Sequence, residues 1–232
     1  MLKNNTNFGL TNNQLKIIAM ISMLIDHIGV ELLPGNDVLR IIGRLAFPIF
    51  AYMIAEGCRY TRNRVKYLSC IFGMGAVFQV VYYFFINSLY QGILITFSLS
   101  IITIYCIDGF IKNKSPLFRA AMTVIMVGVL FVVFAAPHLF KKQGFEIDYG
   151  ALGVMLPVVV YYARGKFGKV LSAAAVLAAM GLFMGGVQWY ALAAIPLLLL
   201  YNQKRGKLNL KYLFYIFYPT HLVVIYLIGQ VL

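Results

Sequence analysis

Stretches of apolar residues long enough to cross a lipid bilayer recur along almost the whole chain, and they limit what it can fold into. A transmembrane helix needs about 20 predominantly apolar residues. Helices suit this setting because they satisfy all their own backbone hydrogen bonds where water is absent. The 232 residues are 62% hydrophobic and only 12% charged, whereas soluble domains carry about 25% charged residues. The sequence therefore predicts an all-α fold, a polytopic integral-membrane helical bundle that forms one domain over residues 1–232.

We expect about nine transmembrane helices. Their predicted ranges are 14–33, 38–57, 67–86, 92–111, 118–137, 149–163, 170–185, 189–201 and 210 to the C-terminus. The seventh and eighth are the least separated, because only residues 185–188 lie between them. A merged or re-entrant pair is the alternative interpretation there.

Positive charge gathers in alternate loops between these predicted helices. The net charge of +13 could suggest a nucleic-acid-binding protein, but the basic residues form short clusters between apolar runs, which is typical of membrane topology. The clusters are Arg59, Arg62, Arg64 and Lys66; Lys112, Lys114 and Arg119; Arg164, Lys166 and Lys169; and Lys204, Arg205, Lys207 and Lys211. In the remaining loops only Lys141 and Lys142 break the pattern, and Glu146 and Asp148 offset them. By the positive-inside rule we expect the basic loops and the N-terminus inside and the C-terminus outside. The expected partner is the lipid bilayer and no nucleic acid.

Ionisable residues inside apolar spans are costly, so each is a candidate for function. The first predicted span contains Lys16 near its cytoplasmic end and Asp26 and His27 deep within it. Eleven residues separate Lys16 from His27, close to three helical turns, so both lie on one face about 16 Å apart along the axis. Asp26 points about 100° away from His27, so its expected partner is a cation on another helix.

Other spans supply such cations and further polar side chains. Arg40 and Arg44 are four residues apart and share a face near the outer end of the second span. Asp148 opens the sixth span at the same level. In the ninth span, Tyr218 and His221 are three residues apart and share a face near the middle of the membrane.

Structural roles are the alternative for several of these residues. Arg40 can form an ion pair with Asp26 or Asp37 that only stabilises the fold. The basic residues Arg59, Arg62 and Arg64 can act only as topology determinants. His221 can be a satisfied interhelical hydrogen-bond partner. The chain contains no H-E-x-x-H, G-x-S-x-G or glycine-rich phosphate motif, so conventional zinc proteases and hydrolases are disfavoured and no metal is expected. A histidine, with a pKa of about 6.5 when unperturbed, suits general-base chemistry.

Several sequence blocks resemble the TraX family. The resemblance runs from about Leu15 to the last predicted span, and its first two blocks are specific in combination. The blocks are Lys16 to Met20 with Asp26 to Gly29, Gly43 to Phe50, Glu56 and Gly57 with Thr61 to Asn63, Asp148 to Gly150, and Phe217 to Leu222.

The family is named for a conjugative-plasmid membrane protein that acetylates the N-terminus of pilin. It is similar to a wider group of transmembrane acyltransferases, which move acetyl groups from acetyl-CoA to acceptors across a membrane. Many of that group have an arginine eleven residues before the first-span histidine, where this chain has Lys16. A lysine keeps the positive charge but lacks the bidentate fork of arginine. The resemblance implies a multi-pass protein of the bacterial cytoplasmic (inner, plasma) membrane.

Together the residues and the resemblance predict an integral-membrane acetyltransferase. It would move an acetyl group from cytoplasmic acetyl-CoA, the co-substrate, to an amine or hydroxyl at the outer side of the membrane, on an acceptor peptide such as a pilin N-terminus or on a cell-surface glycan. The expected catalytic residues are His27, Asp26, Arg44, Tyr218 and His221. The residues expected to bind acetyl-CoA are Lys16, Arg59, Arg62 and Asn63. The residues expected to bind the acceptor are Arg40, Asp148 and Tyr149.

Two chemical routes are open for His27. It can act as a general base that deprotonates the acceptor amine or hydroxyl, or it can carry the acetyl group as a covalent intermediate. In either route Arg44 or Tyr218 would stabilise the developing oxyanion.

A transporter or flippase for a small anion or a lipid-linked sugar is the alternative function. Intramembrane Arg, Asp and His residues also line transport paths. Against it, the sequence contains no internal repeat that relates two halves, and nine spans do not divide into paired repeats. Binding or hydrolysis of acetyl-CoA by the purified protein distinguishes the two functions.

The predicted topology can be tested by labelling single cysteines introduced beside Arg64, Lys114, Lys166 and Arg205, in a chain whose three native cysteines are replaced. A membrane-impermeant thiol reagent should reach these sites only after the cells are opened. Labelling of the Arg205 loop in intact cells would contradict the nine-span scheme.

Overall fold

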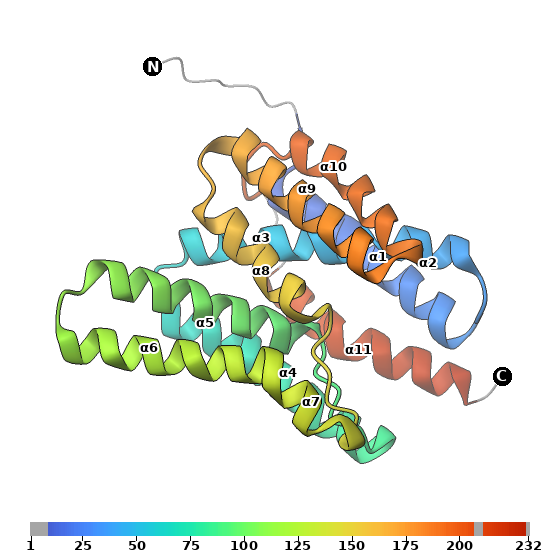
Figure 1. The fold of residues 1–232 in the computed structure, drawn as a ribbon. Coiled ribbons are helices and arrows are strands. Elements are labelled where there is room, and N and C mark those ends of the chain that lie inside the picture. Colours follow the sequence, from blue (N-terminus) through green and yellow to red (C-terminus); the bar gives the residue numbers. More distant parts are fainter. Residues whose placement is uncertain (1–8, 207–210, 231–232) are drawn as a thin grey trace. The chain divides into compact units, whose positions relative to one another are not determined.

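The computed structural model describes residues 9–206 and 211–230, and this part of the chain is almost entirely helical (Figure 1). The all-α prediction is confirmed, because two isolated bridges, Leu10 with Tyr201 and Gln91 with Ile147, are the only β pairing among the described residues. Each predicted span corresponds to helical structure. The elements are α1 (Asn12–Glu31), α2 (Asp37–Gly43), α3 (Ala46–Tyr60), α4 (Arg64–Ile86), α5 (Ile93–Lys112), α6 (Pro116–Leu130), η1 (Phe131–Ala135), α7 (Ala136–Leu139), η2 (Lys141–Gln143), α8 (Gly150–Tyr162), α9 (Gly165–Met184), η3 (Gly186–Ala193), α10 (Ala194–Leu200) and α11 (Lys211–Gly229).

Five helical stretches of the described chain are long and apolar enough to cross a membrane. They are Asp37–Tyr60, Arg64–Ile86, Ile93–Lys112, Pro116–Leu139 and Gly165–Met184. Shorter apolar helices cover Gly150–Tyr162, Gly186–Leu200 and Ile216–Gly229. Helix α1 is not among the five, and its Lys16, Asp26 and His27 reduce its mean hydropathy. A multi-pass membrane protein is therefore supported, while the count of nine spans and the orientation stay predictions. Lys207 and the predicted start of the ninth span at Leu210 lie outside the described residues.

Local sequence signals place the helix ends. Thr11 accepts a hydrogen bond from the backbone of Gln14, and the Gln14 side chain accepts one from the backbone of Thr11, which completes a capping box at α1. Asn36 caps α2 through the backbone N–H of Leu39. Pro116 occupies the first turn of α6, where its missing N–H costs nothing. These caps explain why α1, α2 and α6 begin where they do.

The chain divides into two compact units, and unit 1 comprises the residues up to Met53 and those from Arg164 onward. In unit 1, α1 packs against α2 and α11, and α9 packs against η3 and α10. The backbone N–H of Leu10, before α1, donates a hydrogen bond of 2.8 Å to the carbonyl oxygen of Leu200, the last residue of α10. The most deeply buried apolar side chains of this unit include Leu15, Ile49, Leu177, Met180 and Leu198.

Unit 1 also decides how the seventh and eighth predicted spans relate. Gly185 has φ 67° and ψ −165°, a backbone conformation open essentially only to glycine. Since both η3 and α10 pack back against α9, the chain reverses at Gly185 (Figure 1). The two segments therefore form a helical hairpin and do not merge into one helix.

Unit 2 runs from Ile54 to Ala163. Helix α5 is its centre and packs against α4, α6 and α8. Ser100 donates hydrogen bonds to the carbonyl oxygens of Thr96 and Val154, so it connects α5 to α8 within the apolar interior. The core here includes Leu99, Val129 and Val133.

Helices α4 and α6 expose most of their apolar surface. Only 11% of the apolar stretch of each is buried within the protein. Side chains such as Phe84, Leu117 and Val124 are more than two-thirds exposed. Monomeric soluble proteins rarely expose contiguous apolar faces of this kind, so lipid tails are the fitting environment for these helices.

The close packing of α9 against η3 generates a stability prediction. A Cβ at Gly181 would lie 2.5 Å from the ring of Trp189, whereas a Cβ at Gly168, on the same helix, would have nothing within 4 Å. Gly181→Ala should lower the free energy of unfolding by about 1–3 kcal/mol through overpacking. Gly168→Ala should leave it unchanged or raise it by up to about 1 kcal/mol, since alanine favours the helix. Thermal unfolding in detergent measures both, and a Gly181→Ala midpoint at or above that of Gly168→Ala would contradict the packing.

Candidate functional site

A mostly buried carboxylate flanked by two arginines joins α1 to the end of α2. Asp26 Oδ2 lies 2.8 Å from Arg40 Nη1, and Asp26 Oδ1 lies 3.2 Å from Arg44 Nη2. The three side chains are mostly buried, with exposed fractions of 17% for Asp26, 29% for Arg40 and 11% for Arg44. The prediction that Asp26 pairs with a cation of the next helix is confirmed.

Gly43 makes this ion pair possible. A Cβ at Gly43 would collide with the side chain of Asp26, so only glycine lets α2 approach α1 closely enough. Two cations around one carboxylate leave the group with a net positive charge, which favours an anionic ligand or a developing oxyanion close by.

Two histidines from distant parts of the sequence meet in unit 1. The ring centroids of His27 on α1 and His221 on α11 lie 5.0 Å apart, with the rings edge to face. His27 Nδ1 lies 2.8 Å from the carbonyl oxygen of Met23, and His221 Nδ1 lies 2.7 Å from that of Phe217. Because a carbonyl oxygen only accepts, both Nδ1 atoms carry the hydrogen. In the neutral ring each Nε2 therefore keeps a lone pair, the form that a general base or nucleophile requires.

The His221 ring is enclosed by its own helix. Phe217 stacks on it at 4.6 Å with an interplanar angle of 7°, and the Tyr218 ring lies at 5.9 Å. His221 is 5% exposed, and its Nε2 has no hydrogen-bond partner among the described residues. The prediction that Tyr218 and His221 share a face agrees with these ring contacts. The meeting of His221 with His27 has no signal in the sequence.

The sequence analysis also missed Gln188 on η3. Arg44 Nη1 donates a hydrogen bond of 3.2 Å to Gln188 Oε1, so the arginine that pairs with Asp26 also contacts this amide. Gln188 is 4% exposed. In the sequence, Gln188 is an uncharged amide in a short turn between two apolar runs. A search for charged residues within the spans does not select it.

The residues predicted to hold acetyl-CoA are divided between the two units. Lys16 lies on α1 of unit 1, in the same uninterrupted helix as His27. Arg59, Arg62 and Asn63 lie at the α3–α4 turn of unit 2. Arg62 is exposed, and Asn63 caps α4 by accepting a hydrogen bond of 2.8 Å from the backbone of Lys66. A capping role for Asn63 follows directly from this contact.

A second buried carboxylate organises unit 2. Asp108 accepts hydrogen bonds from Arg64 at 2.5 Å, Tyr161 at 2.9 Å and Tyr162 at 3.1 Å, and Lys112 Nζ lies 3.6 Å from it. Arg59 donates to the carbonyl oxygen of Tyr161 and lies over its ring, 5.5 Å from the centroid. The α3–α4 turn is therefore tied to α5 and α8.

The residues predicted to bind the acceptor do not all belong to one unit. Arg40 lies in unit 1, paired with Asp26. Asp148 and Tyr149 lie in unit 2, just before α8. The backbone carbonyl of Asp148 accepts a hydrogen bond of 2.9 Å from Thr96, and Tyr149 adopts a left-handed conformation with φ 58°. A non-glycine residue in that conformation is strained and can mark a functional position.

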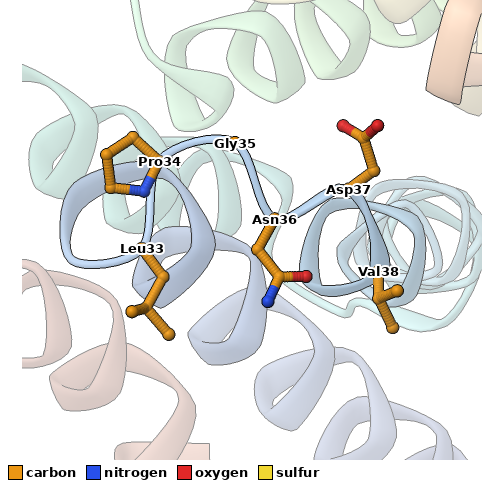
Figure 2. A pocket seen from close by; sticks show the side chains of 6 residues that line it. All are labelled: Leu33, Pro34, Gly35, Asn36, Asp37 and Val38. Atoms are coloured by element: carbon orange, nitrogen blue, oxygen red, sulfur yellow. The ribbon is translucent and has the colours of Figure 1, made fainter.

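A shallow hollow of about 480 Å³ lies over the turn between α1 and α2 (Figure 2). Its lining consists of the consecutive residues Leu33 to Val38, all of them exposed. It contains neither histidine and none of the predicted site residues, so the hollow follows from the shape of one turn.

Comparison with known proteins identifies a family and relatives of this chain. A family model described as TraX protein matches residues 11–229, which confirms the resemblance seen in the sequence blocks. The probable fimbrial assembly protein FimC, serogroup H1, of Dichelobacter nodosus is 25% identical over 241 residues, which cover 91% of this chain and 93% of that protein. The uncharacterized protein RP591 of Rickettsia prowazekii (strain Madrid E) is 27% identical over 162 residues, which cover 70% of this chain and 58% of that protein. No solved structure matches the chain.

The ion pair at Asp26 can be tested independently of any activity. Asp26→Asn leaves two mostly buried arginines without their carboxylate, and breaking such a pair costs about 3 kcal/mol. The thermal midpoint in detergent should fall by about 5 °C or more. Glu31→Gln, which neutralises an exposed carboxylate at the end of the same helix, is the matched control and should shift it little. Equal midpoints for the two variants would show that the pair does not hold α1 to α2.

Proposed function

This chain belongs to the TraX family, and we propose that it transfers an acetyl group from cytoplasmic acetyl-CoA to an amine or hydroxyl acceptor at the outer side of the bacterial cytoplasmic membrane. The observation that carries the proposal is the pair of His27 and His221, whose Nδ1–H groups are both held by backbone carbonyls. The five long apolar helices support the membrane location.

The chemistry follows from the Nε2 lone pair of His27. In direct transfer, Nε2 takes the proton of the acceptor amine or hydroxyl while the acceptor attacks the thioester carbonyl carbon. The carbon–sulfur bond then breaks, and the proton leaves with the CoA thiol. Alternatively, Nε2 itself attacks the thioester, and an acetylated His27 passes the group to the acceptor. His221, on which the Phe217 ring stacks, supplies a second Nε2 lone pair that can hold or relay the proton.

Asp26 and the arginines have an electrostatic role in this proposal. Asp26 does not orient His27, because the Nδ1–H of His27 donates to the carbonyl oxygen of Met23. Asp26 instead holds Arg40 and Arg44 through ion pairs, and it is the residue next to His27 on α1. Their combined charge favours the anionic transition state of acyl transfer. Tyr218, beside the His221 ring, is the further candidate for contact with the oxyanion.

Basic residues are proposed to bind acetyl-CoA, and the acceptor is proposed to be a fibre subunit or a glycan. Guanidinium and ammonium groups hold phosphates through charge-assisted hydrogen bonds, which suits Lys16, Arg59 and Arg62 for the CoA phosphates. A relative carries the name of a probable fimbrial assembly protein, which supports a fibre subunit such as pilin as the acceptor. A cell-surface glycan is the other acceptor of the required chemistry.

This function can be tested in inside-out membrane vesicles prepared from the cell that makes the protein. The vesicles are supplied with radiolabelled acetyl-CoA. Wild-type vesicles should cleave the thioester and transfer the label to protein or glycan. His27→Gln should reduce transfer by a factor of about 100 or more, the range for loss of a general base, because glutamine cannot exchange a proton near neutral pH. His138→Gln makes the same chemical change at an exposed histidine of α7 and should retain full transfer. Uptake of a solute without thioester cleavage would favour a transporter instead.

A further inference from the structure

The orientation of the Gln188 side chain follows from its neighbour. The guanidinium of Arg44 has only donors, so the atom that faces Arg44 Nη1 at 3.2 Å must be the amide oxygen. The amide nitrogen therefore points elsewhere. This assignment rests on chemistry, because the contact would be donor against donor if the amide were reversed.

The amide nitrogen is a buried donor. Gln188 is 4% exposed, and its Nε2 has no hydrogen-bond partner among the described residues. Leaving a buried donor unsatisfied costs about 1–3 kcal/mol. A non-polar residue of similar size would avoid that cost if the position only filled space. The donor therefore fits a ligand acceptor that reaches it when substrate is bound.

Two interruptions of helical structure bring Gln188 and Arg44 together. Arg44 follows the last residue of α2, in the two-residue turn that separates α2 from α3. Gln188 lies just after the reversal at Gly185, and η3 packs against α2. Non-helical backbone at membrane depth is tolerated where it is buried in protein or lines a cavity, and broken helices commonly form binding sites there.

We propose that Gln188 is a catalytic residue whose Nε2 donates a hydrogen bond to the acyl oxygen of the acetyl donor, while Arg44 positions its amide. This inference rests on the proposed acetyl transfer and names the oxyanion donor of that reaction. As the acceptor nitrogen or oxygen forms its bond to the carbonyl carbon, the electron pair of the C=O bond moves onto the acyl oxygen, which Gln188 stabilises. When the C=O bond re-forms, the carbon–sulfur bond breaks and the thiolate takes the proton from His27.

Two substitutions separate donation to substrate from anchoring of Arg44. Gln188→Glu keeps an oxygen for Arg44 but replaces the NH₂ donor with a second oxygen, and the neighbouring guanidinium favours its ionised form. Gln188→Met removes both groups at similar volume. If Gln188 donates to the acyl oxygen, both variants should lose kcat for acetyl transfer by a factor of about 100–1,000, with little change in KM for acetyl-CoA. Gln143→Glu, at an exposed residue of η2, is the matched control and should retain wild-type kcat.

The outcomes distinguish this inference from the proposed function. Wild-type kcat in Gln188→Glu, with a loss only in Gln188→Met, would show that Gln188 merely anchors Arg44 and would overturn the inference. Wild-type kcat in both variants would overturn it as well, and acetyl transfer by the wild type that depends on His27 would then leave the proposed function standing. If wild-type protein does not cleave acetyl-CoA, the proposed function fails and takes the inference with it. Should Gln188→Glu not purify as a folded protein, wild-type kcat in Gln188→Met still overturns the inference.

Discussion

The ion pair between Asp26 and the arginines of α2 is the interaction on which the rest of unit 1 depends. A carboxylate in an apolar span is costly unless it is paired and hydrogen-bonded, and two guanidinium groups satisfy it here. The pairing requires α1 and α2 to approach closely, which Gly43 permits. Arg44 then extends the network to Gln188, so one buried charge connects α1, α2 and η3. Removal of Asp26 leaves two guanidinium groups without their carboxylate, and substitutions within this network should therefore not be additive.

The requirement that buried polar groups have partners also explains why the Nε2 atoms of the two histidines keep their lone pairs. A buried imidazole needs a partner for its N–H, and an α-helix offers the carbonyl oxygen four residues earlier when the side chain turns back along the helix. His27 and His221 both use it, so each N–H is satisfied locally and each Nε2 is left for other partners. The polar groups of the site thus come from three separate parts of the chain, each made stable within its own helix or its own ion pair.

Unit 2 meets the cost of a buried carboxylate in a different way. Asp108 accepts hydrogen bonds from two tyrosines as well as from an arginine, and the arginine lies over the ring of Tyr105, 4.8 Å from its centroid. These contacts involve residues of α4, α5 and α8, and they pair Arg64, the first residue of α4, with Asp108. The structural alternative for basic residues at this turn thereby gains weight for Arg64. Arg62, exposed beside it, stays a candidate for phosphate contact.

The sequence by itself determined the all-α membrane architecture, the approximate helix ranges and the pairing of Asp26 with a cation of the next helix. Those properties follow from hydropathy, helical periodicity and the cost of an unpaired charge, all of which act over a few turns of one chain segment or between neighbouring spans. Only the tertiary structure decided that His221 meets His27 and that Gln188 contacts Arg44, across 194 and 144 positions of the sequence. It also decided that the chain reverses at Gly185. Contacts of such separation depend on which helices pack together and on where a single glycine turns the backbone, and neither leaves a periodic signal in the residues themselves.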